Sequence, residues 1–272
     1  MVKTYLAEVS TDEARGETAR IYEEIRRLTG VPLVALIYRH LATMPGVLDG
    51  LWRDVGLLLE GGVLQERAWG LARGAWPGAV PDPGAALCAL PRDELARAAN
   101  VVDAYNRANP VNYAVVCVIR AARAGAPLPP PIRALPAWTP PPRLGAIAPI
   151  PAMAALAPAA RAQVDGFGKA AGDGEPVLVP TLYRHIAHWP ALLDVAAREV
   201  GPRLATGVFA EAITGFHASV AAAAIDIAQQ RALTVDPLLQ SPAINAVFDR
   251  FSQVIPEMVV VGNFLRRVID RA

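Results

Sequence analysis

Apolar side chains recur at intervals of three and four residues along most of the chain, which is the period of an amphipathic helix. Residues 10–13 have the spacing of a capping box, in which Ser10 accepts from the amide of Glu13. The helical period continues through Ile21, Ile25 and Leu28, and Gly30 supplies a stop signal. Further helices are predicted after Pro45 and Pro190 and over residues 93–106, 111–124, 208–231 and 242–271. Because no alternating strand-turn-strand series is present, the sequence predicts an all-α fold.

Two stretches of the chain resemble each other at an offset of 145 residues. Between residues 37–63 and 182–208, 13 of 27 positions are identical without a gap, including a Tyr-Arg-His triplet in each stretch. The match resumes at an offset of 146, where residues 101–110 align with residues 247–256. Repeats of this kind indicate a tandem duplication. We therefore predict two similar helical halves, residues 1–124 and 152–272, that form a pseudo-dimer.

A proline-rich linker joins the two halves. Residues 125–151 contain 10 of the 25 prolines, a composition that favours extended polyproline II geometry and a semi-rigid strap. Its apolar side chains Ile132, Leu135 and Trp138 indicate that the linker packs along the halves.

Composition and charge exclude several classes of protein. The 272 residues are 53% hydrophobic and carry 26 basic against 25 acidic side chains, so no broad electrostatic footprint for nucleic acid exists. The acidic N-terminal stretch is unlike a signal peptide, and the apolar runs fall far short of the roughly 20 residues that a membrane helix needs. We expect a soluble, cytoplasmic protein without nucleic-acid or membrane partners.

Common cofactor, metal and nucleophile motifs are also missing. Cys88 and Cys117 form no Cys-x-x-Cys pair, and the chain has no Gly-rich phosphate loop and no Gly-x-Ser-x-Gly. His185 and His188 lie three residues apart, but no third ligand stands at suitable spacing. Neither a metal nor an organic cofactor is expected.

The duplication provides a filter for functional residues, because polar side chains present in only one half are free to differ for function. Asn109 and Asn112 align with Ile255 and Met258, and Tyr113 aligns with a valine. All three first-half residues are therefore candidates for substrate contacts. For Asn109, beside Pro110, a plain helix N-cap is the alternative.

A repeated Val-Pro…Tyr-Arg-His…Pro signature occurs at residues 31–45 and again at 179–190. In this signature and in the linker, the chain resembles the group I 2-haloacid dehalogenase family. The resemblance implies an all-helical pseudo-dimer, related to alkylhydroperoxidase-D-like proteins, with its site between the halves. It also implies hydrolysis of 2-haloalkanoates by direct attack of water on C2, with inversion and without an ester intermediate.

The resemblance further implies which residues form the site. Asn112 matches an asparagine that positions water or substrate. Leu33 and Leu36 occupy pocket-lining positions, where the family has bulky apolar groups, and Thr181 forms part of the wall.

The family's catalytic base is an aspartate just before the second Tyr-Arg-His segment. That place is apolar here, and the nearest carboxylates are Asp173 and Glu175. A solvated Gly-rich turn is the alternative interpretation of these two residues.

Three hypotheses follow. The first is a hydrolase of the 2-haloacid dehalogenase type that acts on a short carboxylic acid. The second is a catalytically silent or divergent paralogue that binds a small apolar acid between the halves, and a carboxylate in that cleft would distinguish the two. The third, a structural interaction module, predicts no enclosed pocket. A monomer and a homodimer are both compatible with the sequence.

Overall fold

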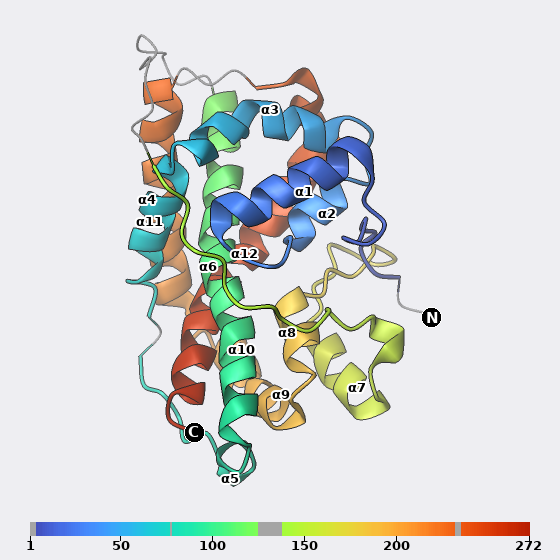
Figure 1. Cartoon of the computed structure of the whole chain (residues 1–272), viewed down its shortest axis with the longest axis vertical. Coiled ribbons are helices and arrows are strands. Elements are labelled where there is room, and N and C mark those ends of the chain that lie inside the picture. The colour runs from blue at the N-terminus through green and yellow to red at the C-terminus, as the bar shows by residue number, and fades with distance from the viewer. Residues whose placement is uncertain (1–3, 77, 125–137, 232–234) are drawn as a thin grey trace.

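The computed structural model describes residues 4–76, 78–124, 138–231 and 235–272, and these residues are arranged as helices (Figure 1). Within these ranges the only β-type pairings are the isolated bridges Tyr5–Val177 and Lys169–Leu178. The α-helices are α1 Gly16–Thr29, α2 Leu36–Leu41, α3 Val47–Glu60, α4 Val63–Ala72, α5 Ala85–Cys88, α6 Arg92–Arg123, α7 Pro158–Gly166, α8 Thr181–Ile186, α9 Pro190–Val195, α10 Gly201–Ala205, α11 Ala210–Arg231 and α12 Pro242–Ile269. Single turns of 3-10 helix are η1 Met153–Ala155 and η3 Pro237–Gln240, and η2 Ala196–Val200 is a π-helical turn. The prediction of an all-α fold is confirmed.

The two longest helices, α6 and α12, lie side by side at the centre of the molecule (Figure 1). Helices α11 and α4 also pack against α6, while α1 to α3 and α7 to α9 form two groups along its length. A side chain at Gly262 would collide with Asn106 of α6, so this glycine permits the close approach of α12. The candidate site residues on α6, Asn109 and Asn112, are buried in this helix pair.

Both central helices continue through an internal proline. Residues 93–106 and 111–124 were predicted as separate helices, but α6 is uninterrupted across Pro110, just as α12 is across Pro256. An interior proline removes one backbone hydrogen bond and costs about 3 kcal/mol in an isolated helix. Both prolines are buried, and packing of α6 against α12 holds each helix on either side of its proline. Asn109 therefore lies inside a helix, and its interpretation as an N-cap is wrong.

The capping box at residues 10–13 closes a turn ahead of α1. The amide of Ser10 donates to the Glu13 carboxylate over 3.0 Å, and the amide of Glu13 donates to the Ser10 hydroxyl over 3.3 Å. Helix α1 begins only at Gly16 and ends at Gly30, which has a φ of 66° and whose amide donates to the Arg26 carbonyl. A left-handed residue of this kind is where glycine is favoured. The predicted stop is confirmed, and the predicted start is wrong by a few residues.

Residues 138–151 of the linker cross in front of α6 in an extended form, and they are held by side chains from α6 and from the segment after α8 (Figure 1). Arg107 of α6 donates to the Pro142 carbonyl over 2.8 Å, and His188 contacts the Pro149 carbonyl over 2.9 Å. Trp138 packs against Gly62 and donates to Glu66, as its apolar character predicted. Ile132 and Leu135 lie outside the described residues.

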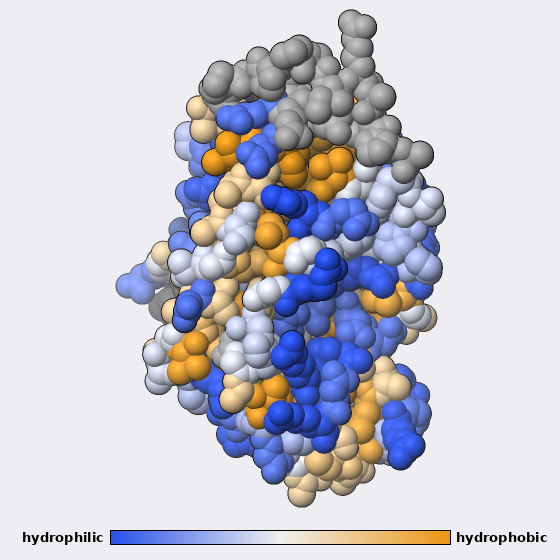
Figure 2. Space-filling view, turned by 90° about the vertical axis from the view of Figure 1, so that its left-hand side faces the viewer, coloured by the Kyte–Doolittle hydropathy of each residue, from blue (hydrophilic) through white to orange (hydrophobic). Residues whose placement is uncertain are grey.

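Hydrophobic residues on the face that carries α4 and α11 form separate areas between hydrophilic ones (Figure 2). In the part of the chain that the structure describes, no single helix combines the length and hydropathy needed to cross a membrane, although one pair bent by 76°, Pro190–Ala205 with Ala210–Gln229, meets the test by length and composition only.

Candidate functional site

A cavity of about 40 Å³, here called the central cleft, lies between α2, α6, α8 and α12. Thirteen of its 14 lining residues are buried, Ala35 being the exception. The lining residues are Ala35, Leu36, Ile37, Tyr105, Asn109, Asn112, Leu178, Pro180, Thr181, Leu182, Phe251, Val254, Ile255 and Met258. Twelve of these form six pairs at the two offsets found in the sequence, 145 between α2 and α8 and 146 between α6 and α12. Corresponding positions of the two repeated stretches therefore line the cleft from opposite sides.

The two long walls of the cleft differ in polarity. Helix α6 contributes Tyr105, Asn109 and Asn112, whereas the paired positions on α12 are phenylalanine, isoleucine and methionine. The short helices reverse this order, because Leu36 of α2 is paired with Thr181 of α8. Apolar walls with a few convergent polar groups are typical of small-molecule sites.

Asn112 has a buried hydrogen-bond donor that lacks a partner. Its side chain is only 2% exposed, and its amide nitrogen is buried with no hydrogen-bond partner. A buried donor without a partner costs about 1–3 kcal/mol. An acceptor placed in the cleft would remove that cost.

Tyr105 is a cleft residue that the sequence analysis missed. Its hydroxyl lies 3.3 Å from Nδ1 of His185, and the two rings meet edge-on at 5.8 Å. Burial raises the pKa of Tyr105 to about 12, although a hydrogen bond from Thr181 opposes this rise. The signal that could have found it is the alignment of residues 101–105 with 247–251, which pairs Tyr105 with Phe251.

A partly buried cluster of three charged side chains acts on Tyr105 of this polar wall. The Glu8 carboxylate lies 3.0 Å from the Arg39 guanidinium, without the alignment of a hydrogen bond, and 3.3 Å from that of Arg184. Arg39 is 5% exposed, and its Nε and one terminal nitrogen have no hydrogen-bond partner. The charges of both arginines and of Glu8 act on Tyr105. With two guanidinium groups against one carboxylate, the cluster is electropositive.

The structure brings four of the predicted site residues together in the central cleft: Leu36, Asn109, Asn112 and Thr181. Leu33 is buried in the core without lining the cleft. Tyr113 lines a different cavity, of about 410 Å³, where its hydroxyl contacts Nδ1 of His217.

The two predicted carboxylates lie away from the cleft. Asp173 and Glu175 are exposed on a turn in which the amide of Glu175 donates to the Gly172 carbonyl over 3.2 Å. Neither lines the central cleft, and among the described residues no Asp or Glu does. A general base must come within hydrogen-bond reach of the attacking water, and neither carboxylate is placed there in this structure. Their role as base therefore stays a prediction.

The structure buries a carboxylate elsewhere. Glu257 of α12 is 9% exposed and lines a cavity of about 470 Å³ beside α7, where it lies 3.2 Å from Nζ of Lys169. Burial raises the pKa of Glu257, and the nearby Lys169 ammonium partly offsets this effect. Glu257 is adjacent in sequence to Met258 of the cleft but opens onto a different cavity.

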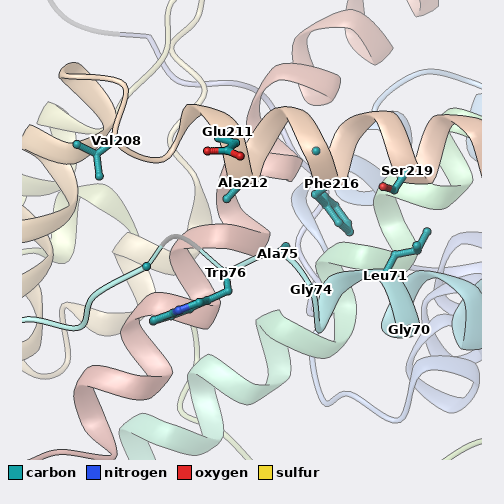
Figure 3. Close-up of a pocket in the computed structure, with 12 residues that line it drawn as sticks. Gly70, Leu71, Gly74, Ala75, Trp76, Val208, Glu211, Ala212, Phe216 and Ser219 are labelled. Atoms are coloured by element: carbon teal, nitrogen blue, oxygen red, sulfur yellow. The ribbon is translucent and has the colours of Figure 1, made fainter.

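A surface groove of about 710 Å³ lies between α11 and the end of α4 (Figure 3). Phe216 and Ala212 point from α11 toward the segment that carries Ala75 and Trp76. Several of the residues that line the groove are glycines, and Val208 at its edge is 57% exposed. Its lining contains no buried polar group without a partner. The central cleft is therefore the better candidate site.

Residues 4–76, 78–124, 138–231 and 235–272 bring no three His, Cys, Asp or Glu side chains together in the manner of a metal site.

Comparison with known proteins places the fold. No family model matches the sequence, and no curated protein matches it. The structure, however, matches solved all-helical structures over its whole length. A complex of D-2-haloacid dehalogenase with L-LA covers 100% of this chain and 97% of its own, with a TM-score of 0.70 and 14% identity. A D-2-haloacid dehalogenase mutant covers 100% of this chain and 96% of its own, with a TM-score of 0.69 and 17% identity. A mutant complex with D-2-CPA covers 100% of this chain and 97% of its own, with a TM-score of 0.67 and 17% identity. The chain thus has the fold of the D-2-haloacid dehalogenases.

Proposed function

We propose that the protein binds a short carboxylic acid with a substituent at C2 in the central cleft. The observation that carries this proposal is the buried amide nitrogen of Asn112, which has no partner inside an otherwise largely apolar cavity. A carboxylate oxygen or a substituent that accepts a hydrogen bond would satisfy it. The volume of about 40 Å³ suits a ligand of a few heavy atoms rather than a drug-sized one.

The charge cluster supports an anionic ligand. Arg39 and Arg184 share the single carboxylate of Glu8, and all three charges act on Tyr105 in the cleft wall. A surplus of one partly buried positive charge raises the affinity of a nearby cavity for a carboxylate, because solvent screens the interaction less than at the surface.

Hydrolytic dehalogenation is a second candidate function. The fold, shared over the whole chain with D-2-haloacid dehalogenases, favours it. In the direct mechanism of the group I family, a water oxygen bonds to C2, the halide leaves with the electrons of the carbon–halogen bond, and a base takes the proton of water. The base would be Glu175 or Asp173, and the turn that carries them would have to move for either carboxylate to reach the cleft. Asn112 would orient the water or the substrate.

One experiment tests binding. Titration with D- and L-2-chloropropionate, followed by NMR, should give saturable binding to the unmodified protein. Asn112→Leu removes the unpartnered donor and should weaken binding about 10-fold, since a hydrogen bond to a charged group contributes about 1.5 kcal/mol. Met258→Leu alters the paired position on the apolar wall and should change the affinity less than 3-fold. Equal losses in both variants, or no binding to the unmodified protein, would refute the proposal.

Halide release in the same samples separates binding from turnover. Binding without release from either enantiomer supports a binding protein. Release that is abolished in Glu175→Gln but retained in Asp173→Asn assigns the base to Glu175. Release retained in both variants would exclude the two carboxylates as the base.

A further inference from the structure

A chain of hydrogen bonds connects the linker to the central cleft. His185 is fully buried, and its Nε2 lies 2.7 Å from the carbonyl oxygen of Ala148. A carbonyl oxygen only accepts, so Nε2 carries the proton. Burial lowers the pKa of His185 to about 4, so the ring is neutral near pH 7 and Nδ1 has a lone pair. The linker therefore fixes the tautomer of this histidine.

The tautomer fixes the direction of the next hydrogen bond. Tyr105 lies 3.3 Å from Nδ1 of His185, and because Nδ1 can only accept, the phenol donates its single proton there. The phenol oxygen keeps its lone pairs, and the Thr181 hydroxyl occupies one of them. Tyr105 thus presents an acceptor to the cleft, while Asn112 in the same wall presents a donor.

The opposite side of the cleft lacks this arrangement. The paired histidine, His40, contacts the carbonyl oxygen of Ala7 through Nδ1 over 2.7 Å, and its aromatic neighbour is Phe251, with ring centres 6.4 Å apart. Phenylalanine has no hydroxyl, so only α6 supplies a phenol to the cleft. Phe251 also shows that a phenylalanine fits against a histidine in this fold, which provides a precedent for Tyr105→Phe.

We infer that Tyr105, whose proton is held by His185 of α8, determines the specificity of the central cleft by accepting a hydrogen bond from a hydroxyl at C2 of the bound acid. This inference rests on the proposed function, the binding of a short carboxylic acid. A halogen or hydrogen at C2 cannot donate to oxygen and leaves the phenol lone pair unsatisfied. The cleft therefore prefers a 2-hydroxy acid to a 2-halo or unsubstituted acid of equal length. Sites that hydrogen-bond a hydroxyl discriminate against analogues without it in the same way.

NMR titration with lactate, propionate and 2-chloropropionate tests the inference. We expect the unmodified protein to bind one lactate enantiomer about 10-fold more tightly than propionate, the ratio that one buried hydrogen bond gives. Tyr105→Phe should bring this ratio close to one, chiefly by weakening the binding of lactate. The matched control Tyr113→Phe removes a phenol that contacts a histidine in a different cavity, and it should leave the lactate-to-propionate ratio within about 2-fold of the original value.

His185 is a positioning residue, and its variant has a separate readout. In His185→Phe the phenol of Tyr105 loses its acceptor and is free to donate, so the preference for lactate over propionate should fall. A purely structural role would weaken the binding of all three acids equally and leave the ratio unchanged, which would overturn the role of His185.

The outcomes separate the two proposals. Binding of all three acids without preference for lactate, or an equal loss for all three in Tyr105→Phe, overturns this inference and leaves the proposed function standing. Failure of the unmodified, folded protein to bind any of the acids overturns both.

Discussion

The two Tyr-Arg-His segments have the same local sequence and similar burial, yet they make different hydrogen bonds. His40 uses Nδ1 to reach a carbonyl oxygen near the N-terminus, and His185 uses Nε2 to reach one in the linker, each over 2.7 Å. Since both acceptors are carbonyl groups, the two histidines hold their protons on opposite nitrogens. The remaining nitrogen of His185 meets a phenol, whereas the ring of His40 lies near Phe251.

Each Tyr-Arg-His segment therefore provides a buried histidine, while segments distant in sequence determine which hydrogen bonds that histidine makes. The arginines show the complementary case. Arg39 and Arg184 occupy equivalent positions, but a single carboxylate, Glu8, lies within ion-pair distance of both. An element present once, such as the N-terminal stretch or the linker, thus makes two similar segments unequal.

The greatest loss of stability should follow from removing the carboxylate of Glu8, which both arginines share. Glu8→Gln leaves two largely buried guanidinium groups without a counter-charge and should lower the free energy of unfolding by about 3 kcal/mol. Chemical denaturation at neutral pH measures the change. Glu60→Gln, at an exposed position, should alter stability by less than about 0.5 kcal/mol. Equal losses in the two variants would show that Glu8 does not hold the arginines.

A smaller effect concerns the histidines and pH. The pKa of His185 in the folded protein is about 4, below the ordinary value of 6.5, because burial disfavours the charged ring, with smaller contributions from His188, Arg184 and Arg39. The unfolded chain therefore binds an extra proton between these values, so stability is complete above pH 6.5 and falls as the pH is lowered. Between pH 7.5 and pH 5, this histidine alone should remove about 2 kcal/mol.

Variants identify the source of that pH dependence. His185→Gln should flatten the fall in unfolding free energy between pH 7.5 and pH 5. Burial also lowers the pKa of His40, so His40→Gln should flatten the profile in the same direction. Retention of the full slope in His185→Gln would mean that this ring accepts a proton in the folded state.

A substitution that makes the second segment resemble the first at one exposed position should change the stability least. His188 contacts the Pro149 carbonyl of the linker over 2.9 Å, whereas the equivalent Thr43 donates to the carbonyl of His40 in its own segment. His188→Thr should cost about 0.5 kcal/mol of unfolding free energy, because the lost hydrogen bond is exposed to water. A loss as large as that of Glu8→Gln would mean that this contact secures the linker.

Helical periodicity predicted the all-α fold. The repeat predicted Asn109 and Asn112, and the family resemblance predicted Leu36 and Thr181; the structure places all four in the cleft. Helix continuity across Pro110 was missed because packing against α12 outweighs a local cost that the sequence displays plainly. Tyr113 lies in another cavity because it follows Asn112 directly, and adjacent helical side chains point about 100° apart.

The remaining misses depend on contacts between distant segments. Tyr105 becomes a polar group of defined direction only through His185 and the linker carbonyl, which no local pattern encodes. The carboxylates at Asp173 and Glu175 were placed by their distance along the chain from the second Tyr-Arg-His segment. A Gly-rich turn leads them into solvent instead.

The pairing of residues across the central cleft has a consequence for the orientation of a bound ligand. A cavity lined identically from two sides would accept a ligand equally well in two orientations related by half a turn. Here Tyr105, Asn109 and Asn112 stand opposite phenylalanine, isoleucine and methionine, so the two orientations differ in energy. The unequal lining therefore gives a bound acid a single preferred orientation.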